Sequence, residues 1–332
     1  MSVKPYLKKY LPWLITFGAL YITFKDLDWS LLISHVGDAD PVYVVGAFVL
    51  TIFSYFFRSR RWQDLFPECK MDYPNATAVL VLGFFFNNVL PARAGEFVRA
   101  HLGAQVSGQS RALVLATVAS ERLIDGLTIS LFFVLFSFGV GEAGLARNLS
   151  YVAVGFAGIA VAVLAIIALR SKLQTLTEKI LEKRQSEKLE WFTNKAHQFL
   201  EGLSPLSSWS RLPLLLLWSA VIWGTELGVF YLVTKAYGAD LSIAFTVFMM
   251  VAMNFSSLIP AAPGGIGVIE AVGTAALVSL GVPKELALVM VLTQHVIQYI
   301  VVGVPGAFLT VTWKKRLEKL RAEELSESAA LI

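Results

Sequence analysis

The sequence contains little charge and a single cysteine. Charged residues make up only 16% of the 332 residues, whereas hydrophobic residues make up 56% and the mean hydropathy is +0.65. This composition excludes a soluble globular domain and indicates a membrane protein with several spans. Because Cys69 has no second cysteine to pair with, an intrachain disulfide and a cysteine-rich metal cluster are also excluded. We expect Cys69 to lie, reduced, in a cytoplasmic loop.

The short motifs of common enzymes are absent as well. The sequence has no phosphate-binding Gly-Lys loop and no His-Glu-x-x-His, and its four histidines are scattered. We therefore expect no enzymatic activity, no cofactor and no metal site. The net charge of +4 comes from short basic clusters at the ends of apolar runs, as topology signals do, so we expect no nucleic-acid partner. No small-residue cleavage site follows the first apolar run, which predicts a retained anchor helix and not a signal peptide.

Long apolar runs are what the sequence does contain. About 20 apolar residues cross the hydrocarbon core of a membrane. Six runs are long enough, at 9–25, 41–57, 111–138, 150–170, 211–236 and 285–312. Two further apolar regions, 75–106 and 242–281, are interrupted near the middle by prolines and glycines, and each half is too short to cross. We predict an all-α polytopic membrane protein with about six transmembrane helices and two re-entrant broken-helix hairpins.

These segments form one transmembrane domain, residues 1–312. A polar segment, 171–210, has apolar residues spaced three and four apart, which predicts an amphipathic connector on the cytoplasmic membrane face. Residues 313–332 form a cytoplasmic tail that we expect to be disordered after Arg321.

The distribution of basic residues predicts the topology. If each broken region enters and leaves on the same side, most lysines and arginines of the loops gather on one side of the membrane. The opposite loops hold only Lys25, Arg147, Lys235 and Lys284. Positive-inside bias then places both termini of this multi-pass protein in the cytoplasm, in the inner (plasma) membrane.

The two broken regions contain similar motifs. The first runs Asn87-Asn88-Val89-Leu90-Pro91-Ala92-Arg93-Ala94-Gly95-Glu96, and the second extends from Asn254 through Pro260-Ala261-Ala262-Pro263-Gly264-Gly265 to Glu270. Each has an asparagine, a proline followed by an alanine, a glycine four residues after that proline, and a glutamate. On the predicted topology the two hairpins enter from opposite sides. We therefore predict an inverted repeat, typical of secondary transporters that bind substrate near the membrane midplane.

These motifs also carry a resemblance. Residues 90–99, Leu-Pro-Ala-Arg-Ala-Gly-Glu-Phe-Val-Arg, and 259–270, Ile-Pro-Ala-Ala-Pro-Gly-Gly-Ile-Gly-Val-Ile-Glu, resemble the paired signatures of the lysylphosphatidylglycerol synthase transmembrane, or flippase-like, family. Glu121-Arg122-Leu123-Ile124-Asp125 lies between them. In two-part members the resemblance implies a membrane module that translocates an aminoacylated phospholipid and a soluble domain that transfers the amino acid. We expect a stand-alone membrane module here, without the synthase domain.

Polar and ionisable residues in and after the breaks are the candidate substrate contacts, because such residues inside a membrane usually face a bundle interior or water. Half-helix N-termini and arginines both suit an anionic group. The candidates are Asn88, Arg93, Glu96, Arg99, Glu121, Arg122, Asp125, Asn254, Glu270 and His295. The candidate hinges are the prolines and glycines of the breaks, namely Pro91, Gly95, Pro260, Pro263, Gly264, Gly265 and Gly267.

Several of these residues also have purely structural interpretations. Glu96 and Arg99 are spaced to pair with each other, and Glu270 lies where it could cap a helix. The basic cluster at 58–61 is interpreted as a topology determinant, or as a collector of anionic lipid headgroups. Glu226 has no evident partner in the sequence, and it is interpreted either as a partner in an interhelical hydrogen bond or as a cavity residue.

We predict a lipid translocator that moves a phospholipid or lipid-linked anionic headgroup between leaflets, through a midplane site formed by both hairpins. Arginines 93, 99 and 122 would receive the phosphate, and nearby acids would pair with them or couple transport. The alternative is a non-catalytic membrane partner or scaffold of a lipid or glycan synthesis enzyme. The candidate partners are thus a lipid substrate, a lipid-synthesis enzyme and a second copy of the chain.

Overall fold

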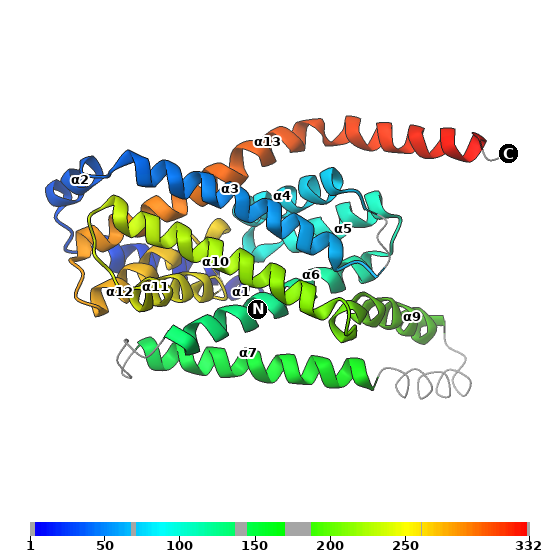
Figure 1. The fold of residues 1–332 in the computed structure, drawn as a ribbon, viewed down its shortest axis with the longest axis horizontal. Helices are drawn as coiled ribbons and strands as arrows, with labels where there is room; N and C mark the ends of the chain where they lie inside the picture. Colours follow the sequence, from blue (N-terminus) through cyan, green and yellow to red (C-terminus); the bar gives the residue numbers. More distant parts are fainter. Residues whose placement is uncertain (1–3, 68–70, 137–144, 170–186, 260, 331–332) are drawn as a thin grey trace.

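The computed structural model describes residues 4–67, 71–136, 145–169, 187–259 and 261–330. This part of the chain is helical and contains no strand, as the apolar runs predict (Figure 1). The α-helices are α1 (Lys4–Phe24), α2 (Trp29–Gly37), α3 (Pro41–Asp64), α4 (Tyr73–Val89), α5 (Gly95–Ser107), α6 (Arg111–Phe136), α7 (Leu145–Ala168), α9 (Glu187–Gly202), α10 (Leu212–Ala236), α11 (Ile243–Ser256), α12 (Val268–Ser279) and α13 (Lys284–Ala330). Short 3-10 helices are η1 (Pro91–Arg93), η3 (Ser204–Ser207) and η4 (Pro263–Gly265).

The long helices coincide with the predicted spans. By length and composition alone, α3, α10 and the Lys284–Glu318 part of α13 could cross a membrane. The helices α1, α6 and α7 lie at the other three predicted spans. The 26 residues of α6 correspond to about 39 Å of helix. Charged residues at 121, 122 and 125 lower its apolarity, and these side chains require partners inside the bundle.

The helix α11 lies at the centre of the bundle. Every residue from Thr246 to Met253 is buried, and α6, α7, α10 and α12 pack against this helix. Its 14 residues extend for about 21 Å, whereas a membrane core is about 30 Å thick. Neighbouring helices thus shield this short helix inside the bundle.

The first broken region forms a helical hairpin. The helices α4 and α5 pack against each other, with η1 between them in the sequence. Gly95 lies so close to α4 that an added Cβ would come within 2.1 Å of the Gly83 carbonyl oxygen, so only glycine fits there. Pro91 begins η1, where its missing N–H leaves no helical donor unpaired.

The second broken region forms another hairpin, of α11 and α12 around η4. Gly264, Gly265 and Gly267 have φ of 71°, 73° and 85°, in the left-handed region that favours glycine. Pro263 begins η4, and Pro260 lies outside the described residues. Because η4 packs against both η1 and α4, the two breaks meet although they are far apart in the sequence.

Two segments differ from the prediction. The cluster Arg58, Arg60 and Arg61 belongs to α3, which runs to Asp64, and not to a loop. Arg58 and Arg61 are buried, so they carry less weight as topology signals than the sequence suggests. The tail after Arg321 continues α13 as a helix to Ala330, because its alanines and glutamates are strong helix formers.

Two other predictions fall partly outside the described residues. Cys69 lies in the gap at 68–70, and the first half of the predicted connector lies at 170–186. The second half forms α9 and η3, and α9 packs against α6.

Candidate functional site

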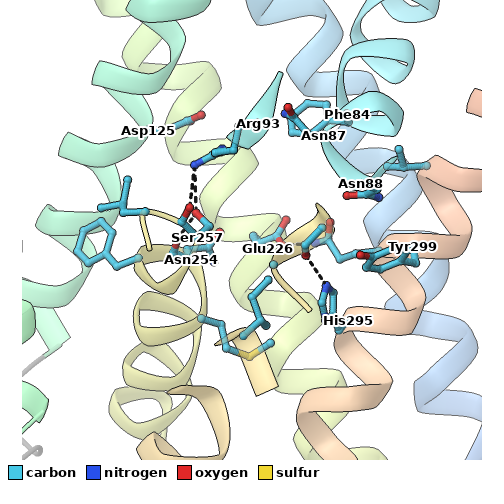
Figure 2. A pocket seen from close by; sticks show the side chains of 18 of the residues that line it. Phe84, Asn87, Asn88, Arg93, Asp125, Glu226, Asn254, Ser257, His295 and Tyr299 are labelled. Carbon is cyan, nitrogen blue, oxygen red and sulfur yellow. Dashed lines mark hydrogen bonds between the residues drawn. The ribbon is translucent and has the colours of Figure 1, made fainter. Parts of the chain in front are cut away.

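A cavity of about 620 Å³ lies where the two breaks meet. Its lining comes from α3, α4, α6, α10, α11, α13 and both broken regions. Figure 2 shows polar side chains arranged around this space, with Arg93 and Asp125 on one side and His295 and Tyr299 on another. The ionisable residues of the lining are Tyr55, Arg58, Arg93, Glu96, Arg122, Asp125, Glu226, His295 and Tyr299. A predominantly apolar bundle thus contains a cavity with several ionisable side chains in its lining.

Arg93 joins the two breaks directly. From the end of η1 it donates hydrogen bonds to the carbonyl oxygen of Ser257 at 3.4 Å and to its hydroxyl at 3.3 Å (Figure 2). Its side chain is still 39% exposed, and its other neighbour, Glu96, lies 3.7 Å away. Arg93 also has φ of 55°, which is uncommon for a residue with a side chain. Such strain costs about 1–3 kcal/mol and is typical of functional sites.

Arg122 connects the first hairpin to α6. Its Nε donates to Glu96 Oε1 at 2.8 Å, and its guanidinium lies over the ring of Phe84 at 5.4 Å. A second carboxylate, that of Asp125, lies 3.8 Å from Arg122 Nη1. Several N–H groups of Arg122 remain available toward the cavity that it lines.

Asp125 lies at the centre of a buried polar cluster. Its Oδ1 accepts hydrogen bonds from Arg61 Nη1 at 2.7 Å and from Trp223 Nε1 at 3.0 Å. Its Oδ2 is buried and has no hydrogen-bond partner among the described residues. Two guanidiniums approach this oxygen, Arg58 at 3.9 Å and Arg122 at 3.8 Å. The arrangement leaves both arginines with N–H groups that can bind a further anion.

A second polar cluster ties α3, α10 and α13 together. Arg58 lies 3.4 Å from Glu226, and Gln298 donates to the same carboxylate at 2.7 Å. Tyr55 donates to the amide oxygen of Gln298 at 3.2 Å. The structure thus supplies the partner of Glu226 that the sequence does not reveal.

Arg99 and Glu121 form a bidentate ion pair away from the cavity. Both Arg99–Glu121 hydrogen bonds are 2.8 Å long, and the two side chains are 2% and 0% exposed. Arg99 also lies over the ring of Trp62 at 4.0 Å. Neither partner lines the cavity. The local pairing of Glu96 with Arg99 suggested by their spacing is wrong, because each finds a tertiary partner on α6 instead.

The second break is held from two sides. Thr16 of α1 accepts a hydrogen bond from the Ala262 N–H at 2.9 Å and donates to the Ile266 carbonyl at 3.3 Å. On the other side, His295 of α13 lies 2.6 Å from Glu270 and 3.2 Å from the Gly264 carbonyl oxygen. Glu270 also accepts the N–H of Gly267 at 2.6 Å, so it does cap α12.

The structure brings most of the predicted site residues to one place. The predicted contacts that line the cavity are Asn88, Arg93, Glu96, Arg122, Asp125, Asn254 and His295, and the predicted hinges that do so are Gly264 and Gly265. Glu270 lies behind the lining, in contact with His295. The structure does not bring Arg99 and Glu121 to the cavity. They hold α5 against α6 and so position the first hairpin.

The predicted site residues do not include several that line the cavity, among them Arg58, Glu226, Tyr55, Gln298 and Tyr299. One signal could have found Arg58: the helical pattern of α3 continues past it to Asp64, so this arginine lies within a helix and not in a loop. The remaining residues come from helices far apart in the sequence, and no local spacing predicts their meeting. No group of three or more His, Cys, Asp or Glu that could hold a metal ion occurs in the part of the chain that the structure describes.

Comparison with known proteins identifies the family. The family model for the lysylphosphatidylglycerol synthase TM region matches residues 11–306. The chain belongs to this family. The match confirms the resemblance carried by the two break motifs, and it includes every residue that lines the cavity. The family and the apolar helices together show a membrane-embedded protein.

Curated relatives have two kinds of name. The glycosyltransferase AglD of Haloferax volcanii is 26% identical over 338 residues, which cover 90% of this chain and 53% of that protein. The chain therefore spans about half the length of AglD. A UPF0104 membrane protein of Pyrococcus horikoshii is 24% identical over 304 residues, covering 84% of this chain and 89% of that protein. One from Methanothermobacter thermautotrophicus is 25% identical, with coverage of 81% and 84%. No solved structure matches the chain.

Proposed function

We propose that this family member translocates a phospholipid or lipid-linked anionic headgroup between membrane leaflets, without enzymatic activity of its own. The observation that carries the proposal is the charged cavity of about 620 Å³ between two helix breaks. A water molecule occupies roughly 30 Å³ in the liquid, so the cavity has room for a headgroup. Polar side chains inside a membrane are costly and commonly mark a transport path.

The proposed membrane arrangement follows from helix length. The helices α4, α5, α11 and α12 have 17, 13, 14 and 12 residues, too few for a comfortable crossing. We propose that each hairpin enters and leaves on one side, the two from opposite sides of the inner membrane, as an inverted repeat. Contact between η1 and η4 would then lie near the midplane. Both termini would be cytoplasmic.

Three arginines are the proposed headgroup contacts. Arg93 is the least engaged, because its hydrogen bonds to Ser257 are long and its side chain is partly exposed. Arg58 and Arg122 approach Asp125 Oδ2 without a hydrogen bond and line the same cavity. A phosphate can accept hydrogen bonds from several guanidiniums at once. Arg99, which forms a bidentate pair with Glu121 outside the cavity lining, has a supporting role in this proposal.

A second candidate function is a membrane partner for a lipid or glycan synthesis enzyme. It is supported by the similarity of 90% of this chain to about half of a protein named a glycosyltransferase. In that case the cavity would serve packing, and lipid would not cross. A second copy of this chain is also a candidate partner.

A vesicle assay separates the two functions. Purified protein is reconstituted into vesicles that contain a trace of fluorescent phosphatidylglycerol, phosphatidylethanolamine or polyprenyl phosphate, and a membrane-impermeant quencher reports the outer leaflet. Translocation predicts that protein accelerates the exchange of at least one of these lipids, with or without a pH gradient. Equal exchange in protein-free vesicles for all three lipids under both conditions would contradict it and favour the partner function.

A further inference from the structure

His295 lies between two acceptors at the second break. Its Nδ1 is 2.6 Å from Glu270 Oε1, and its Nε2 is 3.2 Å from the carbonyl oxygen of Gly264. The other oxygen of Glu270 accepts the backbone N–H of Gly267 at 2.6 Å. Both side chains are almost completely buried, at 10% and 7% exposure. The pair therefore connects α13 to both ends of the glycine-rich turn between η4 and α12.

The number of protons in this arrangement is set by its contacts. A carbonyl oxygen only accepts, so the 3.2 Å contact of Nε2 is a hydrogen bond only with a hydrogen on Nε2. The 2.6 Å contact between Nδ1 and the carboxylate then requires a second proton, on the ring nitrogen or on the carboxyl oxygen. If that second proton leaves, two lone pairs face each other. If the remaining ring proton moves to Nδ1, the contact with Gly264 is lost instead. One exchangeable proton is thus needed to hold both contacts.

We propose that Glu270 and His295 form a proton-binding site, and that its proton clamps the second break against α13. Release of the proton into the cavity leaves a neutral imidazole and a carboxylate, which cannot make both contacts. The turn at Gly264 is then freed from α13. Because the closed clamp holds the proton, the clamp is closed at lower pH and opens as pH rises.

The surroundings allow the break to move in this way. Gly264 packs directly against the hydroxyl of Tyr299, which is buried and has no hydrogen-bond partner among the described residues. That hydroxyl can bond a carbonyl or a water once the turn shifts. On the opposite side, Thr16 holds Ala262 and Ile266 through a hydroxyl that does not titrate. The turn is therefore fixed on one side, and on the other its attachment depends on a proton.

The carboxylates that line the cavity are each paired with an arginine. Around the cavity, Glu96 pairs with Arg122, Asp125 with Arg61, and Glu226 with Arg58. Arginine keeps its charge at all physiological pH values, whereas histidine changes charge within that range. The helices packed against α12 and α13 also contribute neutral lining groups, which are Asn87 and Asn88 of α4 and Asn254 of α11. Further ionisable lining groups are Tyr55, Arg93 and Tyr299. The helix α2 packs further along α13, where the backbone N–H of Asp28, the N-cap residue of α2, donates to Glu285. Among the acids at the cavity, Glu270 is thus the one paired with a titrating base.

The clamp does not depend on what crosses the membrane, whereas its use as the coupling step rests on the proposed function. A cysteine at Ala261, which is buried beside the break and lines the cavity, reports opening. We replace Cys69 by serine, introduce Ala261→Cys, and measure the maleimide labelling rate from about pH 5 to about pH 9 with His295 present or as His295→Gln. Dividing the two rates at each pH cancels the titration of the thiol itself.

We expect His295→Gln to label several-fold faster than the parent at the acid end and equally fast at the alkaline end. Glu270→Gln should instead label slowly at every pH, because its amide N–H can donate to His295 Nδ1 in place of the exchangeable proton. His35→Gln on α2 should match the parent throughout. A ratio of His295→Gln to parent labelling that is constant with pH overturns the proposal.

Because a variant could misfold, ¹⁵N-histidine NMR of the parent provides a second test. Among the four imidazoles, that of His295 should change its ¹⁵N signals as the cysteine becomes reactive, because its Nδ1 loses either a proton or the hydrogen bond from the Glu270 carboxyl group. His295 ¹⁵N signals that do not change across this pH range also overturn the clamp. Neither readout involves lipid transfer, so the clamp can be supported or overturned independently of translocation.

Discussion

Arg93 and Ser257 form a direct hydrogen-bonded link between the two helix breaks. The arginine ends η1, the serine caps the C-terminal end of α11, and both the carbonyl and the hydroxyl of Ser257 accept from one guanidinium nitrogen. Both bonds are long for a charged donor, at 3.4 and 3.3 Å. A phosphate would be a stronger acceptor than either. The link therefore holds Arg93 in the cavity without saturating it.

Arg93 should be functionally required but locally unfavourable. Its φ of 55° is relieved by glycine and not by alanine. We expect Arg93→Gly to be more stable than Arg93→Ala by about 1 kcal/mol, while both variants lose translocation because both lack the guanidinium. Thermal unfolding in detergent measures the first difference. Equal melting temperatures for the two variants would show that the backbone at this position is not strained.

Gly264 and Tyr299 should be energetically coupled. A Cβ at Gly264 would overlap the Tyr299 hydroxyl, and the φ of 71° at this position is unfavourable for alanine. We expect Gly264→Ala to destabilise by more than about 2 kcal/mol, and Tyr299→Phe alone to be nearly neutral, since its hydroxyl has no partner. The double variant should recover only the overlap with the hydroxyl, because the ring Cζ would still lie 2.6 Å from the new Cβ, and it should keep the backbone part. Additive effects in a double-mutant cycle would refute this coupling.

Arg99 and Glu121 should matter for folding and not for headgroup contact. Removing one partner leaves a buried charge, so Arg99→Met and Glu121→Leu should each cost about 3–5 kcal/mol. The double variant should cost less than either single change, because no unpaired charge remains. Thermal unfolding of the three variants tests this. A double variant that folds normally yet fails to move lipid would instead assign this pair to the substrate.

Thr16 should hold the second break independently of pH. Thr16→Val keeps the shape but removes the acceptor for the buried Ala262 N–H, at an expected cost of about 1–3 kcal/mol. Thr23 is the matched control, since it is equally buried on α1 but bonds only Ala19 of its own helix. We expect Thr16→Val to label faster at Ala261→Cys at every pH, and Thr23→Val to match the parent. Equal labelling in both threonine variants would show that α1 does not hold the break.

The sequence predicts this fold well where local chemistry decides it. Glycines and prolines mark both breaks, and the structure shows why at Gly95 and Gly264, where a side chain has no room. The sequence fails where partners come from distant helices. Spacing favours a local Glu96–Arg99 pair, but Arg122 and Glu121 of α6 provide better geometry. Similarly, position at the end of an apolar run suggests a loop for the cluster at 58–61. Burial against α6 and α10 becomes evident only once the helices are packed.

The most direct test of translocation through this cavity compares single arginine substitutions in the vesicle assay. Arg58→Ala, Arg93→Ala and Arg122→Ala each remove a guanidinium that lines the cavity. Arg60→Ala is the matched control, because Arg60 lies on α3 with a side chain 48% exposed, pairs with Asp64 and lies outside the lining. With each variant checked for its thermal unfolding, we predict lipid exchange at least about tenfold slower for the first three, as expected when a charge-assisted bond of about 1.5–3 kcal/mol is lost, and unchanged exchange for Arg60→Ala. Exchange that is equally fast in folded Arg93→Ala and Arg60→Ala protein would contradict a headgroup path through the cavity.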